Sequence, residues 1–307
     1  MNSLKNNKGI ALVITLLVVA LLVTMVVEMN YISRIGLALA ENRGNLKKAF
    51  WLAKSGIAVG KMLLKQDKFE SIVDDLNEAW AFPFPPTPIG DGVVKLSITD
   101  EERKININEM VRDGKWLNTR MVDMVKRLFL SFDLDENLID GIIDWLDSDD
   151  NPRANGAENS YYNSLDPPYN CKNGQMNSIS ELKMIYGITP EIFSKIAPYL
   201  TVKSSGKINI NTASLTVLTC LHNEISEEVA EEIIRFREKS PFEALSDLKK
   251  VPGITENIYT KIVDLIDIES EYFTIHSTGK VVDAISEITT IGKRKDGYWE
   301  TVYYRVD

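Results

Sequence analysis

Oxygen-bearing side chains gather between residues 144 and 158 at a spacing that suits a metal ion. Counted from Asp147, an Asp, Asn or Glu stands at positions 1, 3, 5, 9 and 12, which is the ligand spacing of an EF-hand calcium loop. Because these ligands are oxygens, without His or Cys, they select a hard cation, and we expect Ca²⁺ rather than Zn²⁺. The candidate ligands are Asp144, Asp147, Asp149, Asp150, Asn151, Asn155 and Glu158.

Two features of this run depart from a true EF-hand. Position 6 is Pro152, whereas the EF-hand uses a glycine there for its sharp turn, and the run continues into residues 161–169 without a clear exiting helix. We therefore expect a calcium site with a different loop path. The alternative is a solvated acidic loop, although four carboxylates within residues 144–150 would repel one another without a cation.

The other reactive residues support no enzyme. Cys220 and His222 lie close together in sequence, but no Asp or Asn completes a convincing nucleophilic triad. The two histidines are far apart, and no glycine-rich phosphate loop is present. We expect no catalytic residues and no organic cofactor.

The composition of the chain further limits the kind of partner that it can bind. The chain has 307 residues, with 35 Lys and Arg against 44 Asp and Glu, and a net charge of -9. This acidic balance argues against nucleic acid as the main partner, because phosphate binding needs a basic surface. The length allows two domains of ordinary globular composition.

One segment stands out from this average. Residues 10–27 carry no charge and are almost entirely apolar, which is just long enough to span a bilayer. Lys5 and Lys8 precede the segment, so the N-terminus is expected in the cytoplasm and the rest of the chain across the membrane. No small-x-small cleavage site follows, as a secretory signal would require. Helical periodicity without proline continues to residue 66, and we expect one helix over about 10–65.

The remainder of the chain is predicted to be α+β. Four prolines within residues 82–88 predict an extended linker, and residues 93–98 alternate like a strand. Strands are also expected at 272–275, 284–292 and 297–306, with an Asp296-Gly297 turn between the last two. A largely helical stretch separates these strands, so the simplest architecture is an antiparallel sheet with an inserted α-domain.

The inserted stretch contains a duplication. Residues 104–108 recur unchanged at 207–211, and residues 180–189 match 246–255. Each unit resembles a helix-hairpin-helix (SAM-like) module, which many DNA-binding proteins use, and the second copy resembles the DNA-uptake receptor of competent bacteria. A membrane-anchored DNA receptor is therefore the alternative function. Thr189 and Thr255 stand where DNA-binding hairpins usually carry the second glycine, which disfavours phosphate binding.

A basic leader that ends at Gly9, directly before an apolar helix, resembles the type IV prepilin-like proteins. In that class a prepilin peptidase cuts after the glycine, so the mature chain would begin at Ile10. Most members carry Glu at the fifth mature position, where this chain has Ile14. In lacking this glutamate, and in its length and motifs, the chain resembles the minor pseudopilin K family of the type II secretion system.

This resemblance implies a non-enzymatic subunit at the tip of a periplasmic pseudopilus, supporting protein export across the outer membrane. Its partners would be the minor pseudopilins I and J, with the minor pseudopilin H, the major pseudopilin G and the prepilin peptidase. The chain would be a single-pass inner-membrane protein with its C-terminal domain in the periplasm. The family binds calcium, and the Asp-Trp-Leu-Asp run from Asp144 with the later Asp-Pro-Pro-Tyr resembles its pattern. In the oxidising periplasm, Cys171 and Cys220 could form a disulfide or remain free.

The expected organisation has six parts. They are a leader (1–9), a transmembrane segment (10–27), the periplasmic part of the helix (28–66), a linker with the first strands (67–108), the inserted α-domain (109–267) and the C-terminal strands (268–307). Within the α-domain and its lead-in strand, the modules are expected at 104–200 and 207–267, with the metal loop at 144–178.

Overall fold

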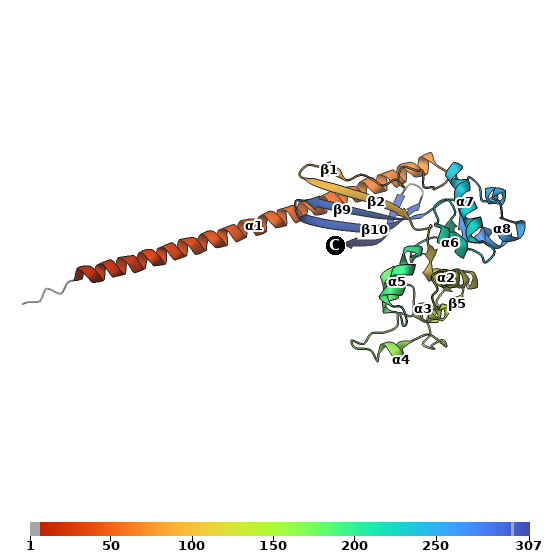
Figure 1. Ribbon diagram of the computed structural model, residues 1–307, viewed down its shortest axis with the longest axis horizontal. Helices are drawn as coiled ribbons and strands as arrows, with labels where there is room; N and C mark the ends of the chain where they lie inside the picture. Colours follow the sequence, from red (N-terminus) through yellow and green to blue (C-terminus); the bar gives the residue numbers. More distant parts are fainter. Residues whose placement is uncertain (1–6, 296–297) are drawn as a thin grey trace, which may run out of the picture.

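One long helix organises the molecule. The structure, a computed structural model, describes residues 7–295 and 298–307. Helix α1 (Asn7–Glu70) first projects alone and then joins a folded body (Figure 1). The side chains of residues 10–27 are exposed, and α1 is long and apolar enough to cross a membrane. The predicted helix is therefore confirmed, and it extends a few residues beyond both expected ends.

A five-stranded antiparallel sheet covers one side of the second half of α1 (Figure 1). The strands are β1 (Thr87–Ile89), β2 (Gly92–Asp100), β9 (Tyr272–Val281), β10 (Ala284–Lys295) and β11 (Tyr298–Val306), hydrogen-bonded in the order β1-β2-β9-β10-β11. Ala53, Ile57 and Leu64 of α1 are buried against Phe273 and Ile275 of the sheet. These residues bury the apolar stripe of the helix and fix its position against the sheet.

The predicted strands are confirmed: three have longer bounds than expected, and the last, β11, begins at Tyr298. The linker at 82–88 was expected to stay extended, but its last residues form the edge strand β1, which pairs with β2 from Thr87↔Val94 to Ile89↔Gly92. Pro88 is tolerated there because an edge strand leaves backbone positions without ladder partners. The predicted Asp296-Gly297 turn lies outside the described residues.

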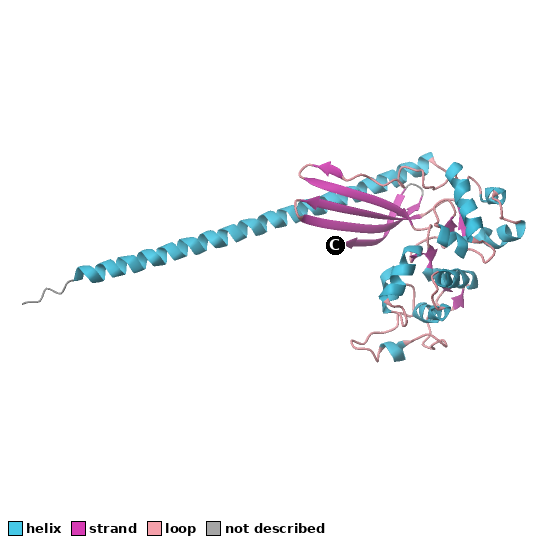
Figure 2. Cartoon of the chain, in the orientation of Figure 1, coloured by secondary structure: helices cyan, strands magenta, loops and turns pink. Residues whose placement is uncertain are grey.

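The inserted domain leaves the sheet at the end of β2 and returns at the start of β9 (Figure 2). Its first copy contains β3 (Ile105–Asn106), η1 (Ile107–Met110), β4 (Val111–Arg112), β5 (Trp116–Leu117), α2 (Thr119–Ser131), η2 (Glu136–Leu138), α3 (Ile139–Leu146), α4 (Asn159–Tyr162), η3 (Ile179–Met184), α5 (Pro190–Ile196), η4 (Ala197–Tyr199) and β6 (Leu200–Thr201). Its second copy contains β7 (Ile208–Asn209), α6 (Leu215–Cys220), α7 (Glu227–Lys239), η5 (Leu245–Lys250), α8 (Glu256–Ile262), η6 (Val263–Leu265) and β8 (Ile266–Asp267). One continuous apolar core runs through both copies.

The structure explains why the five-residue repeat is identical in the two copies. Its first isoleucine and the asparagine that follows form short parallel strand pairs, β3 with β6 and β7 with β8. Its last asparagine is buried and pins a loop of its own module. The amide of Asn108 donates to Met176 O (2.9 Å) and accepts from Met176 N (2.8 Å). The amide of Asn211 makes the same pair of hydrogen bonds with Phe242, at 3.0 and 2.9 Å. The duplication is therefore structural as well as sequential.

Candidate metal centre

Helix α3 and the loop after it enclose the side chain of Asp144. Ile139, Ile142 and Leu146 face the core, and Asp144 is fully buried because the loop folds back over it. The backbone N–H of Arg153 donates to both carboxylate oxygens, at 3.3 and 3.0 Å. A Cβ on Gly156 would lie 1.8 Å from the Asp144 Oδ2 atom, so the close approach of this backbone requires glycine.

Two further predicted ligands are buried without compensation. Asp147 caps the C-terminus of α3, and its Oδ1 atom accepts no hydrogen bond from any described residue. Neither carboxylate oxygen of Glu158 has a partner among the described residues, although the side chain is 1% exposed. Burial raises the pKa of Glu158 to about 7, with nearby Asp144 and Asp147 adding to the effect. Burial likewise raises the pKa of Asp144 to about 6 and that of Asp147.

The structure adds one residue that the sequence analysis missed. Asn173 donates from its Nδ2 atom to Asp149 O (2.7 Å), while its buried Oδ1 atom has no partner within the described chain. No sequence signal marks Asn173, because it lies outside the spaced run and reaches the loop through tertiary folding.

The remaining predicted ligands make other contacts. Asn151 donates to Asp149 Oδ1 from both its backbone and its side chain, at 2.9 Å each, which lowers the pKa of exposed Asp149. Asn155 bonds to Asp140, and Asp150 accepts from Asn159. The five EF-hand positions therefore do not all turn inward. Asp147 and Glu158, at positions 1 and 12, are the two that are buried with unpaired oxygens.

Two features of this loop suit a hard cation, although its carboxylates do not converge on one point: among the described residues, the acidic side chains whose ligand atoms lie within 4.8 Å of one another are Asp67, Asp74 and Glu78. A buried carboxylate oxygen without a hydrogen-bond donor is costly, and the loop contains three such oxygens together with the free amide oxygen of Asn173. Residues 133–169 contain ten acidic side chains and one basic side chain, Arg153, so this stretch alone accounts for the net charge of -9. The Arg153 Nε atom lies 3.6 Å from Asp144 and offsets one charge. The loop therefore lacks hydrogen-bond donors for its buried oxygens, and it also lacks positive charge to balance its carboxylates.

Aromatic side chains pack between helix α3 and the segment that follows Glu158. Trp145 of α3 packs edge-on against Tyr162, with ring centroids 5.3 Å apart, and the Tyr162 hydroxyl accepts from Tyr186 N (3.2 Å). Tyr162 belongs to α4, a single turn directly after Glu158, where no clear exiting helix was expected. This packing fixes the position of Glu158 relative to α3.

The suggested disulfide is absent from the described structure, in which Cys171 and Cys220 are both buried free thiols. The Cys171 thiol lies beside Glu158 but donates to Asp144 O (3.6 Å), and Cys220 lies in α6 of the second copy. Burial raises the pKa of each thiol to about 12. Neither cysteine is therefore a reactive thiolate near neutral pH.

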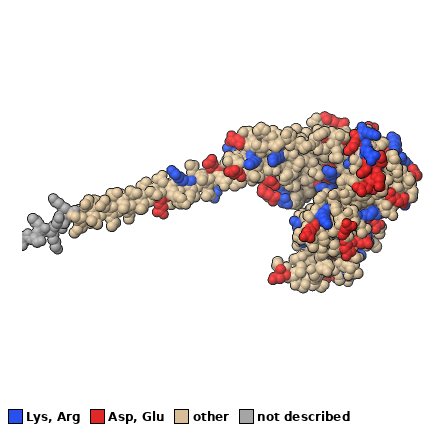
Figure 3. All heavy atoms as spheres, viewed as in Figure 1, with Lys and Arg blue, Asp and Glu red and all other residues tan. Residues whose placement is uncertain are grey.

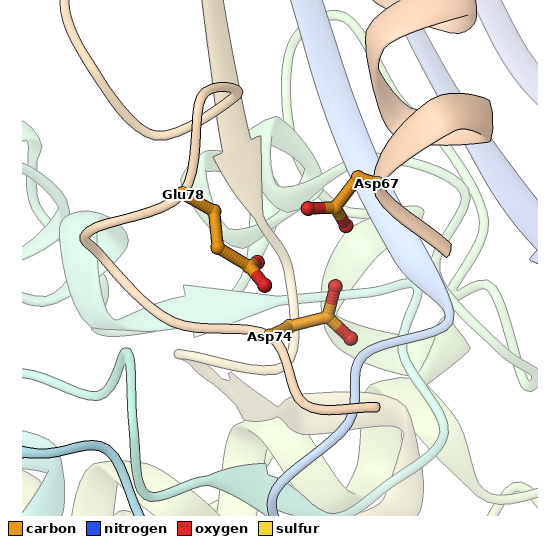
Figure 4. Close-up of side chains that lie close together, drawn as sticks. All are labelled: Asp67, Asp74 and Glu78. Atoms are coloured by element: carbon orange, nitrogen blue, oxygen red, sulfur yellow. The ribbon is translucent and has the colours of Figure 1, made fainter. Parts of the chain in front are cut away.

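A second group of acidic residues lies far from the loop, where the inserted domain joins the sheet. Figure 4 shows the carboxyl groups of Asp67, Asp74 and Glu78 turned toward one another, and their ligand atoms lie within 4.8 Å. Arg294 already serves this group as a cation, since it lies 2.7 Å from Asp67 and also pairs with Asp74. We therefore assign the candidate metal centre to the 144–158 loop. The sequence gives no sign of the second group, because Arg294 lies more than 200 residues from its partners.

The charged side chains of the second module's hairpin pair with one another at the surface. Lys249 pairs with Glu256 at 2.9 Å, and Lys250 pairs with Asp247 at 2.6 Å. The Thr255 hydroxyl accepts from Ile258 N (3.2 Å), which satisfies one amide at the start of α8. On the face that Figure 3 shows, acidic and basic side chains are interspersed over the body, and no basic stripe of the kind typical of a DNA-binding face is visible there.

Comparisons with known proteins agree on one family. Residues 103–205 match the family model for type II secretion system (T2SS) protein K, and residues 203–267 match a helix-hairpin-helix motif. The chain is 27% identical to type II secretion system protein K of Pseudomonas aeruginosa over 259 residues, covering 80% of this chain and 77% of that protein. It is also 27% identical to protein K of Aeromonas hydrophila over 323 residues, covering 95% and 94%.

The fold matches a solved structure. A chain in the crystal structure of the GspK-GspI-GspJ complex from enterotoxigenic Escherichia coli superposes with a TM-score of 0.76 at 17% identity. The match covers 87% of this chain and 99% of that chain. The α+β fold with a long helix, a pilin-like sheet and an inserted α-domain is therefore confirmed.

Proposed function

We propose that this chain, which resembles type II secretion system protein K over most of its length, is a minor pseudopilin at the tip of a periplasmic pseudopilus, where it supports protein export across the outer membrane. The observation that carries this proposal is the use of α1. Its first part exposes an apolar surface of membrane-spanning length, and its second part packs against the sheet in the core of the folded body. A pseudopilin built in this way can pack helix to helix with others while holding its body outside the membrane.

The position of the inserted domain favours the tip. The domain is attached at the end of the body farthest from the apolar part of α1, and it extends to one side of the sheet (Figure 1). A pseudopilin stacked above this one would meet the bulk of that domain. Ile14 supports the same position, because an apolar residue there cannot neutralise the N-terminal amine of a neighbour ahead of it.

We propose a single-pass inner-membrane topology with a cytoplasmic N-terminus and a periplasmic body. Lys5 and Lys8 would hold the leader in the cytoplasm until a prepilin peptidase cuts between Gly9 and Ile10. The proposed tip partners are the minor pseudopilins I and J, on the model of the complex named for the structural relative, with the minor pseudopilin H and the major pseudopilin G below them. The role is one of assembly rather than catalysis.

We also propose that the acidic loop holds one structural Ca²⁺. Asp147 and Glu158 would supply carboxylate oxygens, Asn173 an amide oxygen, and Asp144 and Asp150 supporting negative charge. Asp149, Asn151 and Asn155 are predicted ligands that hydrogen-bond to other groups in the cation-free loop, so they would have to exchange those bonds to bind. The ion would neutralise the buried charge and fix the loop on the side of the inserted domain.

The test is co-purification. The full chain is co-expressed with the minor pseudopilins I and J of its own organism, extracted in detergent and captured by a tag on this chain. We expect a stoichiometric complex of the three, and no shift of duplex DNA by the captured chain in low salt. Capture of neither partner, together with a DNA shift, would favour the alternative of a membrane-anchored helix-hairpin-helix DNA receptor, which rests on the match over residues 203–267.

A further inference from the structure

The inserted domain and the sheet meet at a junction with a surplus of buried and half-buried carboxyl groups. The chain crosses this junction three times: in the loop after α1, at the end of β2, and just before β9. The carboxyl groups are those of Asp67 at the end of α1, Asp74 and Glu78 in the loop, and Asp100 and Glu102 at the end of β2. Asp74, Asp100 and Glu102 are each at most 2% exposed.

These carboxyl groups hold the two parts together through hydrogen bonds. Asp74 accepts from Ser270 N (2.7 Å), and its own backbone N–H donates to Ile268 O (2.9 Å). Glu102 accepts from Ser205 N of the inserted domain and from Tyr272 N of the sheet, both at 3.0 Å. Arg294 of β10 completes the junction. It donates to Leu64 O (3.2 Å) and Ser270 O (3.0 Å), and it pairs with Asp67 and Asp74.

The neighbouring lysines do not cancel the surplus, because each is paired with another acid. Those pairs are Lys68 with Glu269, Lys104 with Glu101, Lys207 with Asp267, and Lys293 with Glu271, at distances of 2.5 to 3.0 Å. Within the described chain, Arg294 is thus the one cation in direct contact with this group of five carboxyl groups. Asp67 and Glu78 are half-buried and the other three are buried, so five carboxylates beside one guanidinium cannot all be charged at an acceptable cost.

We propose that the junction is a proton-dependent hinge: a proton shared among its surplus carboxyl groups holds the inserted domain against the sheet, and release of that proton as pH rises loosens the contact. The proposal rests on two observations of the structure. The carboxyl groups link the three segments of chain that meet at the junction, and these five groups share one cation, Arg294. The site of protonation belongs to the coupled group as a whole.

The pKa values of all five carboxyl groups are raised, as retention of a proton at the junction requires. Burial, with the nearby charge of Glu78, raises the pKa of Asp67 from 3.8 to about 7. Burial raises the pKa of Asp100 to about 6, and it raises the pKa values of Asp74, Glu78 and Glu102. A carboxyl group whose pKa is raised on folding contributes stability that is present at low pH and lost as pH rises through the folded value. The junction should therefore lose stability as pH rises from about 3.8, the ordinary pKa of Asp67, to about 7, its folded pKa, and the last part of this loss falls between pH 6 and pH 8.

The test variant is Asp67→Asn, which imitates the protonated acid. The amide keeps an acceptor for Arg294 and gains a donor toward the other carboxyl groups. The matched control is Asp91→Asn, the same change on an exposed acid in the β1–β2 turn that pairs with Lys48. The full chain is used in detergent micelles with saturating Ca²⁺. Its unfolding equilibrium and the hydrogen exchange of peptides containing Asp74 and Ser270 are followed at pH 6 and pH 8, with the intrinsic pH dependence of exchange removed.

For one group with a folded pKa of about 7, the unfolding equilibrium constant should rise about tenfold from pH 6 to pH 8. We expect this rise, with faster exchange of both peptides at pH 8, in the wild type and in Asp91→Asn. Both effects should be much smaller in Asp67→Asn, and Glu78→Gln should act in the same direction.

Three results would overturn the proposal. The first is an Asp67→Asn chain with the same pH dependence as the wild type. The second is a pH-dependent loss of stability with no change in exchange at Asp74 and Ser270. The third is a junction that opens on chelation rather than on a rise in pH, in a manner that Asp67→Asn abolishes, since a metal ion would then take the place assigned to the proton.

Discussion

Replacing Glu158 by Gln should have opposite effects with and without calcium. Without a cation, both Glu158 oxygens are buried and unpaired, and burial raises the pKa of this group from 4.5 to about 7. A group of this kind contributes stability that is present below the unfolded pKa and lost as pH rises through the folded value. The calcium-free chain should therefore lose stability between about pH 4.5 and pH 7, and the uncharged Gln should remove this loss.

The size of the effect follows from the displacement of the pKa. The full displacement corresponds to ~3 kcal/mol above pH 7. Glu158 lines an open cleft of about 490 Å³, and a small shift of the loop would bring solvent to its charge and lower this cost. We therefore expect Glu158→Gln to stabilise the calcium-free chain at pH 8 by about 1–2 kcal/mol. In the wild type, calcium at a hundredfold excess over its dissociation constant should add about 2.7 kcal/mol. For an unfolding unit of about 150–250 residues, this raises the Tm by roughly 5–10 °C.

The assay is thermal unfolding of the full chain in detergent at pH 8, with calcium or with a chelator. Glu158→Gln should melt above the wild type in chelator, below it in calcium, and respond little to calcium. Glu243→Gln is the matched control, because this acid is exposed on the second module away from the loop. If Glu158→Gln destabilised the chain in chelator, or left the calcium response intact, the description of Glu158 as an unpaired calcium ligand would be wrong.

Three further changes test other parts of the structure. In Gly156→Ala the new Cβ would press on the Asp144 carboxylate, so we expect a loss of about 1–3 kcal/mol and weaker calcium binding in a calcium titration. Asn211→Ala leaves the backbone groups of Phe242 without their partner, and chemical unfolding should report a loss of about 2–4 kcal/mol, with Asn177→Ala on the surface as the control. N-terminal sequencing of the membrane-extracted chain should begin at Ile10, whereas a chain that still begins at Met1 would contradict cleavage after Gly9.

Periodicity and repetition predicted most of the fold. The long helix, the C-terminal strands and the duplicated module each follow from patterns within a short stretch of sequence, where apolar spacing or identity between copies is visible. Local proline content did not predict that residues 87–89 would pair with β2, because that pairing depends on the neighbouring strand. The asparagines of the repeat were visible as a motif, but their loop-pinning role required the tertiary structure.

The sequence predicted which residue types make up the acidic loop, but it predicted only part of how their side chains are arranged. Spacing drew attention to Asp147 and Glu158, which the structure buries without partners. The same spacing could not predict that Asn151 would bond back to Asp149, or that Asn173 would enter from outside the run. The junction around Arg294 left no local signal, since its partners at Asp67 and Asp74 become neighbours through folding alone.

If the proposed function is correct, this chain stands at the tip of the filament. The most direct measurement is immunogold electron microscopy of sheared pseudopili from cells that carry an epitope on the inserted domain, for example after Ser240, the exposed C-cap residue of α7. A position at the tip predicts label at one end of each filament and none along its length. Label distributed regularly along the filaments, or filaments that assemble at normal length and number without this chain, would contradict it.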